Sequence, residues 1–443
     1  MKRMMIAGFS CFLIQMNVWA QTTAKYSLQQ CIDTALANNI QVKQSGLLTD
    51  EAKVNLKQAK ANMLPDLNAN FDHGINQGRS VDITSNSYVN QSVTYGTYGA
   101  STGVMLFNGM NLQNNVKQNK FAFNASKMEF QQAKDNLTLN VILAYLQVLN
   151  NEDLLTSAEK QKELSGKQLE RLQVLDSVGA VSPSLVSDLK GQTMSDELNI
   201  LNAKNQLESS KLSLSQLMNV PYSKDMSLER INAEDFLTAY TQTPDDIYGN
   251  ALKQFSLIKA VEYRTKSSQF AFKSVKGTLF PVLYLSGSAQ TNYSSAATNS
   301  NGKIGYGEQV KNNIFSGLNV GLQIPIFNRF RVRNNIKLAG IAVKNSELVE
   351  ERTKVELHQQ IEQAHLNMTN AYETYNTLLQ QVEAYASSFK AAEIRFASGV
   401  GTSIDYLTAK NNLDRASINL ISSKYDFVLR KKVLDYYQNV ITK

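Results

Sequence analysis

The residues of this chain that are best suited to metal chemistry lie in one short stretch. Glu362 and His365 form a Glu-x-x-His pair, and His358 lies one helical turn before Glu362. On a helix these side chains share a face, as they do in di-iron helical bundles. Such a site needs two of these motifs and two further glutamates, and we find only one motif. We therefore expect a solvated stretch, or one facing an internal channel, instead of a metal site.

Other catalytic patterns are missing from the sequence. It contains no phosphate-binding GxxxxGK[ST] loop, no GxSxG nucleophile motif and no paired cysteine motif. The third histidine, His73, lies in a segment that alternates like a strand. We therefore predict a protein that is not an enzyme and that carries no cofactor.

The elements that carry these residues occur twice. At an offset of 216 residues, Ala35-Leu36 recurs as Ala251-Leu252; further on, at an offset of 220, Phe107-Asn108 recurs as Phe327-Asn328. More residues follow the same offsets: Lys43, Lys57, Lys60, Pro65 and Leu67 in the first part, and Asn114, Asn115, Lys117, Gly179 and Lys190 in the second. A repeat this long exceeds a solenoid unit. It indicates the duplication of a whole helix–strand–strand–helix module.

The start of the chain reads as a secretory signal peptide, residues 1–20. Lys2 and Arg3 precede an apolar stretch, and small residues stand at the cleavage positions before Gln21. Cys11 follows a poor lipobox, so we do not expect lipidation there. Cys31 is then the one cysteine of the mature chain, which excludes an internal disulfide and suits a small buried residue.

The composition excludes further classes of protein. The formal net charge of +7 falls to +5 without the signal peptide, which is only mildly basic for a long chain and does not indicate a nucleic-acid partner. After residue 20 we find no run of 18 apolar residues, so we expect no transmembrane helix and exclude a cytoplasmic-membrane transporter. The mature chain divides into a first repeat at 21–221, a linker at 222–246 and a second repeat at 247–443.

Long helices are predicted where proline is absent. Residues 109–180 and 327–443 contain no proline, and proline breaks helix interiors. In the second range apolar residues alternate steps of three and four, which is a coiled-coil pattern: Ile361, Ala364, Met368, Ala371, Tyr375, Leu378, Val382, Tyr385 and Phe389. A helix from 109 to 178 would be on the order of 100 Å long, so each repeat should end in a long helical hairpin.

Four short segments have the alternation of β-strands, near 66–74, 97–106, 282–290 and 315–324. Small polar residues stand on one face and apolar residues on the other, and each segment has the length of a membrane-crossing strand. Aromatic residues cluster at the strand ends, as interfacial residues do. The segments 76–94 and 291–313 between them are rich in Asn, Ser, Gly and Tyr, as expected of exterior loops.

Closure of such a sheet requires more than one chain. Four strands cannot close a barrel, and open sheet edges are not tolerated in lipid. Eight strands give a barrel filled by side chains, whereas twelve leave room for a channel. We therefore expect a homotrimer in contact with outer-membrane lipid. An alternative is a soluble, non-channel coiled-coil protein, periplasmic or secreted, in which two amphipathic hairpins cap a helical bundle.

The order of these motifs resembles the TolC family of outer-membrane efflux proteins, from Tyr26 to about Tyr437. The marks are Pro65 and Pro281 after the first helix of each repeat, 107–109 and 324–328 before the long helices, and the hairpin turns 178–182 and 395–402. The resemblance implies a mainly α fold with a twelve-stranded trimeric β-barrel in the outer membrane and an α-helical barrel extending into the periplasm.

The resemblance also implies a function and partners. Members of the family conduct drugs, small molecules or proteins out of the cell, in multidrug efflux and in type I secretion. Their helical tips meet a periplasmic adaptor, the membrane fusion protein, which links the tube to an inner-membrane pump. By the family's pattern the docking tips are Gly179 and Ser182 in the first hairpin and Arg395, Gly399 and Thr402 in the second.

The resemblance further assigns a periplasmic constriction to Asp405. The family often has a second acidic residue three positions on, where this chain has Thr408, and the first repeat has Leu185 in place of Asp405. The first hairpin has Leu175 in place of Arg395, so the two kinds of tip are not equivalent. Asp405 also suits the first turn of a helix capped by Thr402, and the two roles are compatible.

Overall fold

The computed structural model describes residues 25–81, 86–90, 92–231, 240–438 and 440. The predicted signal peptide and Cys11 lie outside these residues, as does part of the predicted linker. The chain forms two compact units, each of which draws on both repeats. Unit 1 consists of Met1–Asn39, Asn140–Thr238 and Ala371–Leu429, and unit 2 consists of Ile40–Leu139, Ala239–Asn370 and Arg430–Lys443.

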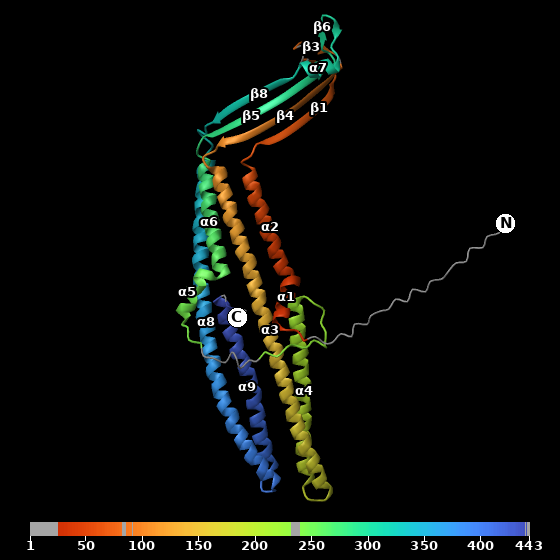
Figure 1. The fold of residues 1–443 in the computed structure, drawn as a ribbon, viewed down its shortest axis with the longest axis vertical. Coiled ribbons are helices and arrows are strands. Elements are labelled where there is room, and N and C mark those ends of the chain that lie inside the picture. The colour runs from red at the N-terminus through yellow and green to blue at the C-terminus, as the bar shows by residue number, and fades with distance from the viewer. Residues whose placement is uncertain (1–24, 82–85, 91, 232–239, 439, 441–443) are drawn as a thin grey trace, which may run out of the picture. The chain divides into compact units, whose positions relative to one another are not determined.

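The duplication is visible in the helices (Figure 1). The first repeat contains α1 (Leu28–Asn38), α2 (Ile40–Ala61), α3 (Asn111–Ser177) and α4 (Pro183–Met218). The second contains α5 (Pro244–Gln254), α6 (Ser256–Gly277), α8 (Arg331–Ala397) and α9 (Ser403–Tyr437). Helices α3 and α8 both have 67 residues, and α2 and α6 both have 22. The predicted mainly α fold with an internal duplication is confirmed.

The coiled-coil pattern of the second repeat is confirmed in α8. Ile361, Met368, Ala371 and Phe389 are buried, and the other positions of the pattern are partly buried. No helix in the described part of the chain combines the length and the apolarity needed to cross a membrane.

The two short helices α1 and α5 begin in the same way. Ser27 accepts a hydrogen bond from the backbone N–H of Gln30, whose side chain accepts one from the N–H of Ser27. Thr243 and Asp246 repeat this reciprocal cap at α5. Such a cap satisfies two backbone donors that a helix start otherwise leaves unpaired. Cys31 of α1 is fully buried, as predicted, and burial raises the pKa of its thiol to about 11.

Four strands of unit 2 form one antiparallel sheet with the order β1-β4-β5-β8. They are β1 (Asp66–Asn76), β4 (Val93–Phe107), β5 (Val282–Ser294) and β8 (Phe315–Gln323). In Figure 1 each strand adjoins the end of one helix. Along the chain α2 leads into β1, β4 into α3, α6 into β5, and β8 into α8. The edges of the sheet are β1 and β8, and nearly all of their side chains are exposed.

The strand register follows the sequence repeat. In the β1–β4 pair Phe71 lies opposite Tyr98, and in the β5–β8 pair Gly287 lies opposite Leu318. Adding 216 to Phe71 and 220 to Tyr98 gives the second pair. Because the whole ladder obeys these two offsets, the two halves of the sheet are copies of one hairpin.

The sheet has two different faces, because residues opposite each other point to the same side. One face is apolar and exposed; it includes Leu67, Phe71, Ile75, Leu318, Val320 and Leu322. The other carries small polar side chains, including Asn68, Asn70, Ser101, Ser286, Ser288 and Asn319. His73 lies on the apolar face, where its ring stacks on Tyr98 and Tyr293.

The segments expected to be exterior loops contain short elements of their own. The first carries the hairpin β2 (Arg79–Val81) and β3 (Tyr88–Asn90), and the second carries β6 (Thr298–Asn299), β7 (Gly302–Lys303) and α7 (Tyr306–Asn312). Gln309 of α7 is buried and joins this segment to β5, since its side chain bonds the N–H and the carbonyl of Ser294.

The ends of α3 and α6 meet where sheet and helices join. The Asn111 side chain donates to the carbonyl and hydroxyl oxygens of Ser274, at 2.8 and 3.0 Å. Gly109 has φ +63°, and a Cβ there would lie 2.2 Å from the carbonyl oxygen of Gly277. Only glycine fits this approach. The repeat counterpart of Gly109, Arg329, has a similar φ of +55° and carries a side chain.

The two faces generate a matched pair of substitutions on β8. Val320→Arg places a charge on the apolar face, and Asn319→Arg places the same charge on the polar face. If the apolar face contacts lipid, the first change costs about 2–4 kcal/mol at mid-membrane depth and should prevent assembly in the outer membrane. The measurement is the yield of heat-modifiable oligomer in outer-membrane fractions. Normal yield from Val320→Arg would contradict a lipid-facing strand.

Candidate functional site

The helical hairpin turns of unit 1 contain the residues predicted to dock a partner. The turn between α3 and α4 has Gly179 at φ +73°, and the turn between α8 and α9 has Gly399 at φ +75°. The Gly179 N–H donates to the Asp176 carbonyl at 2.8 Å, and the Gly399 N–H donates to the Phe396 carbonyl at 3.1 Å. A left-handed residue at a helix end favours glycine because it has no Cβ. Both glycines therefore have a structural role, because they allow the chain to turn between the two helices.

The helices that follow the two turns begin differently. Ser182 precedes Pro183 in the first turn of α4, and its side chain makes no capping bond. Thr402 accepts a hydrogen bond from the N–H of Asp405 at 3.2 Å and donates its hydroxyl proton to the Asp405 carboxylate at 2.8 Å. Asp405 is exposed. The structure thus places Asp405, as expected, in the first turn of a helix capped by Thr402, and leaves its role in a constriction as a proposal.

The tips of the two hairpins differ for a packing reason. Arg395 is exposed, whereas its counterpart Leu175 packs against an apolar cluster beside the turns. Leu185, the counterpart of Asp405, packs against the same cluster. The buried members of this cluster come from both hairpins and are Leu172, Leu189, Phe389 and Tyr406. The first hairpin therefore presents leucine to the core where the second presents charge to solvent.

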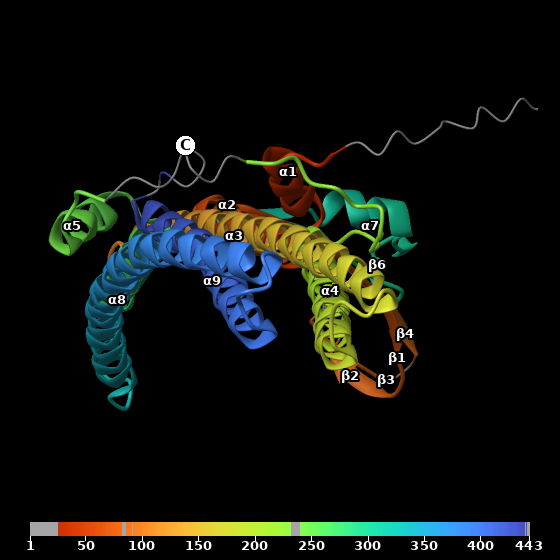
Figure 2. The ribbon, with the colours of Figure 1, turned by 90° about the horizontal axis from the view of Figure 1, so that it is seen from below.

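The two hairpins run side by side (Figures 1 and 2) and are also joined by polar contacts. The Arg171 guanidinium donates to the Ala397 carbonyl at 3.2 Å, and the Ser403 hydroxyl donates to the Asp188 carboxylate at 3.4 Å. These exposed contacts are weak compared with the apolar cluster behind them.

Apolar side chains at the tips were not predicted as site residues. Val178 is 73% exposed, Val400 81% and Ile404 73%. Single exposed apolar residues are common, but these lie at or next to the two turns. The sequence signal for Val178 and Val400 is an apolar residue next to a turn glycine, where solvent-exposed turns usually carry polar residues.

A buried charge cluster on α4 and α9 was also missed. Lys410 and Asp196 are 1% and 2% exposed. The Lys410 ammonium group lies 3.2 Å from the Asp196 carboxylate and 2.6 Å from that of Asp414. The Ser165 hydroxyl of α3 and the Gln192 amide also donate to Asp196. Burial raises the pKa of the Asp414 carboxyl, and its bond with Lys410 partly offsets this.

This cluster distinguishes the two repeats. Lys190, the counterpart of Lys410, is exposed. Near the cluster the Tyr406 hydroxyl is buried without a hydrogen-bond partner among the described residues, and burial raises its pKa to about 12. The cluster joins α3, α4 and α9 by buried charges that are costly to leave unpaired.

The Glu-x-x-His motif of α8 does not gather a set of metal ligands. His358 lies 3.4 Å from Asp245 and 3.7 Å from Glu362, and His365 lies 3.2 Å from the Gln242 carbonyl. Throughout the described ranges no three His, Cys, Asp or Glu side chains lie close enough to share a metal ion.

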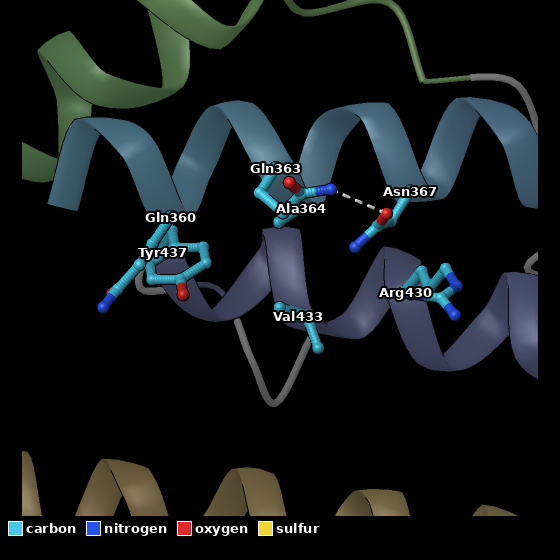
Figure 3. A pocket seen from close by; sticks show the side chains of 7 residues that line it. All are labelled: Gln360, Gln363, Ala364, Asn367, Arg430, Val433 and Tyr437. Carbon is cyan, nitrogen blue, oxygen red and sulfur yellow. Dashed lines mark hydrogen bonds between the residues drawn. The ribbon is translucent and has the colours of Figure 1, made fainter. Parts of the chain in front are cut away.

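A pocket of about 220 Å³ lies next to this motif (Figure 3). Gln363, within the motif, points toward Asn367 and donates to its side-chain oxygen at 2.9 Å. The walls are amide and apolar groups of α8, with Arg430, Val433 and Tyr437 of α9. We find no pair of acid and base there that would support catalysis.

A duplicated helix–strand module with a two-faced sheet and long helical hairpins defines the class of outer-membrane channel proteins. The solved structure of CusC matches with a TM-score of 0.81 at 15% identity and covers 96% of this chain and 95% of its own. VceC from Vibrio cholerae matches with a TM-score of 0.78 at 16% identity, covering 93% and 94%. These likenesses establish the fold.

The sequence establishes the family. The model of the outer membrane efflux protein family matches residues 31–220 and 247–434, and the chain belongs to this family. The outer membrane protein TolC of Escherichia coli is 23% identical over 409 residues, which are 91% of this chain and 80% of that protein. The predicted outer-membrane location and the resemblance to TolC are confirmed.

The buried charge cluster generates a stability prediction. Lys410→Met leaves Asp196 buried without its counter-charge, and breaking a buried pair in this way costs about 3–5 kcal/mol. We expect a lower urea midpoint of unit 1 unfolding, followed by circular dichroism. In the control, Lys190→Met removes an exposed lysine and should change stability by about 0.5 kcal/mol or less. Equal urea midpoints for the two variants would show that the Lys410–Asp196 ion pair does not contribute to the stability of unit 1.

Proposed function

We propose that three copies of this chain form a tube that conducts solutes out of the cell, together with a periplasmic adaptor and an inner-membrane pump. The protein catalyses no reaction. It supplies the conduit, the surface that the adaptor contacts and a constriction that must widen, while the pump supplies the energy. The cargo class, whether drugs, other small molecules or proteins, is set by the partners.

The observation that carries this proposal is the pair of unpaired edges, β1 and β8, on a sheet whose register obeys the sequence repeat. Within one chain β4 pairs with β5, and Tyr98 lies opposite Thr291. Under the same offsets the repeat counterpart of Tyr98 is Leu318 of β8, and the counterpart of Thr291 is Ile75 of β1. These two strands are the edges of one sheet, so the pair is available only between neighbouring copies.

The number of copies follows from two requirements, that the sheet closes into a barrel and that the barrel leaves an open interior. Open edges in hydrocarbon leave backbone groups unpaired at several kcal/mol each, so the sheet must close. Two copies give an eight-stranded barrel, and side chains fill the interior of a barrel of that size. Three copies give twelve strands, with the small polar residues of each sheet lining a wet interior.

The helical tips are the proposed adaptor surface. Gly179 and Ser182 belong to one kind of tip, and Arg395, Gly399 and Thr402 to the other. Beside them Val178, Val400 and Ile404 expose apolar area that a partner would cover. Since only one kind of tip carries the exposed Arg395, we expect the adaptor to contact the two kinds of tip unequally.

The first test is planar-bilayer conductance of the mature protein purified in detergent, with the mass of the assembly measured on the same preparation. We expect discrete channels from a species of three chains. A soluble protein without conductance would favour the alternative of a coiled-coil structural protein.

Engineered cysteines test the seam between copies. In a Cys31→Ala background, the pairs Leu318→Cys with Ile75→Cys and Leu322→Cys with Phe71→Cys should form disulfide-linked oligomers, because paired residues on antiparallel strands lie about 4.5–5.5 Å apart. The measurement is non-reducing gel electrophoresis of outer membranes.

The matched controls combine the same four cysteine positions in the opposite pairing. Leu318→Cys with Phe71→Cys, and Leu322→Cys with Ile75→Cys, use the same four positions but misalign them by four residues, about 13 Å. This exceeds the reach of a disulfide, about 7 Å between Cα atoms. Cross-linking of the exchanged pairs alone would refute this register without refuting the trimer.

Asp405 is the proposed constriction residue. Asp405→Ala removes its charge and the hydrogen bond that its carboxylate accepts from Thr402, while the Thr402 hydroxyl can still cap the backbone N–H at position 405. Asp405→Asn removes the charge but keeps an amide oxygen that can accept from Thr402. If the charge narrows the entrance, both variants should raise single-channel conductance or alter its sensitivity to cations. Unchanged conductance in both would leave Asp405 only as a first-turn acid bonded to the cap Thr402.

A further inference from the structure

Positive charge is concentrated where the helices meet the sheet. We define the collar as the ranges 53–65, 108–120, 269–281 and 328–340, which adjoin the four strands on their helix side and correspond to each other under the two repeat offsets. The collar contains eleven lysine or arginine residues and no aspartate or glutamate. The whole chain has 45 basic and 38 acidic residues, so acidic residues are in excess outside the collar.

The collar lies at the boundary of the apolar sheet face. On β8 this face carries Leu318, Val320 and Leu322, and the exposed side chains continue with Ile326 and Phe327, which are 94% and 73% exposed. The arginines follow within a few residues. With the apolar face in hydrocarbon, the collar therefore lies at the depth of the phospholipid headgroups on the helix side of the membrane.

The basic side chains of the collar have no acidic partners among the described residues. Over the described residues none of them forms an ion pair. Asp66 of β1 directly follows the collar range 53–65, and its carboxylate accepts hydrogen bonds from the N–H of Gly103 and the Asn68 amide. Lys117 and Lys273 lie over the ring of Phe270, which leaves their charge uncompensated.

Helix stability does not account for the collar. Lys60 and Lys276 stand in the last turns of α2 and α6, where a positive charge is favourable. Arg331 and Arg333 stand in the first turn of α8, where the helix dipole disfavours a positive charge. An external anion would offset this unfavourable placement.

The other repeat shows that the fold does not require these arginines. The counterparts of Arg329, Arg331 and Arg333 are Gly109, Asn111 and Gln113, which are uncharged. Asn111 instead bonds Ser274 of α6 within the same chain. The basic cluster therefore belongs to one of two otherwise equivalent junctions.

A pocket of about 290 Å³ accompanies the arginines. Its walls include Ile326, Phe327 and Phe330, and Arg333 also lines it. The site thus combines apolar surface with an adjacent guanidinium group, which suits a molecule with an acyl chain and an anionic head.

We propose that this collar, centred on Arg329, Arg331 and Arg333, binds an acidic phospholipid of the leaflet that faces the helices. The lipid phosphate pairs with the guanidinium groups, which match phosphate geometry with two parallel hydrogen bonds. An acyl chain lies against Ile326 and Phe327. Clusters of basic residues at a membrane surface select acidic lipids in this way.

The binding site rests on the proposed function, since closure of the barrel places α8 beside α2 of the next copy. The chain's own α3–α6 junction is closed by Gly109 against Gly277. The corresponding residues at the junction between copies are Arg329 and Ala61, whose Cβ atoms exclude so close an approach. This junction is wider than the one within the chain, and the arginines line it.

Tryptophan fluorescence tests the proposal at the site itself. The only tryptophan, Trp19, lies in the predicted signal peptide, so a single new tryptophan reports one position. Phe327→Trp places the reporter at the collar arginines, and Phe107→Trp places it at the uncharged junction. The mature protein is placed in vesicles of phosphatidylcholine with about 20% phosphatidylglycerol, an acidic lipid of the class that basic clusters select. The tryptophan fluorescence is then quenched by brominated acyl chains, carried by one lipid or by the other.

The two reporters should respond differently. In the Phe327→Trp variant we expect brominated phosphatidylglycerol to quench the tryptophan at least about threefold more effectively per lipid than brominated phosphatidylcholine, because the arginines concentrate the acidic lipid there. In the Phe107→Trp variant the two brominated lipids should quench about equally.

Charge variants provide the controls. Arg329→Gly, Arg331→Asn and Arg333→Gln together install the residues of the other junction and should abolish the preference seen by the Phe327→Trp reporter. Lys190→Gln, Lys204→Gln and Lys224→Gln together remove three exposed charges of unit 1 and should preserve the preference. Equal quenching of this reporter by both lipids, or a preference that survives the arginine changes, would overturn the proposal. Displacement of phosphatidylglycerol by inorganic phosphate at equal concentration would also overturn it, in favour of a site for free phosphate.

Channel conductance and assembly mass are measured on the same preparations. A conducting trimer without lipid preference rejects the lipid site alone. A protein that neither conducts nor forms trimers rejects the proposed function as well.

Discussion

An unpaired backbone N–H or C=O group in hydrocarbon costs several kcal/mol, and a strand at a sheet edge presents a row of such groups. The sheet of this chain ends in two such edges, β1 and β8, while its exposed apolar face suits lipid. Under the proposed function, insertion of the sheet into a membrane would require strands supplied by other copies. Because the two halves are copies of one hairpin, the ladder between β4 and β5 shows the register that the proposed ladder between β8 and the next copy's β1 would have.

The duplicated halves keep the backbone and diverge in charge. The lengths of α3 and α8 are equal, and the turn glycines Gly179 and Gly399 have nearly the same φ. At the tips the first repeat turns Leu175 and Leu185 toward the apolar cluster, where the second exposes Arg395 and Asp405. A closed ring of three copies would then have near sixfold geometry but threefold chemistry. Such an arrangement can present two kinds of surface to one partner.

The charges of the chain occupy different environments in its two units. In unit 1 the buried Lys410 pairs with the buried Asp196 and with the partly buried Asp414. In unit 2 the collar is exposed and carries one sign only. Buried charges must be paired within the protein because desolvation is costly, whereas exposed charges can be neutralised by a surface outside it. The two arrangements therefore have different roles, one in packing and one in contact with the surroundings.

The sequence by itself determined the duplication, the long helices, the strand segments and the family, because these depend on local periodicity, on proline and glycine placement and on the order of motifs. It also located the turn residues Gly179 and Gly399 and the cap Thr402–Asp405, because capping and tight turns act over a few residues. Only the tertiary structure decided which of two equivalent lysines is buried: Lys410 meets Asp196, which precedes it by 214 residues. It alone showed that Leu175 and Leu185 share one cluster and that β1 and β8 are left as edges. Burial and strand pairing join residues far apart in the chain, so they cannot be read from local patterns.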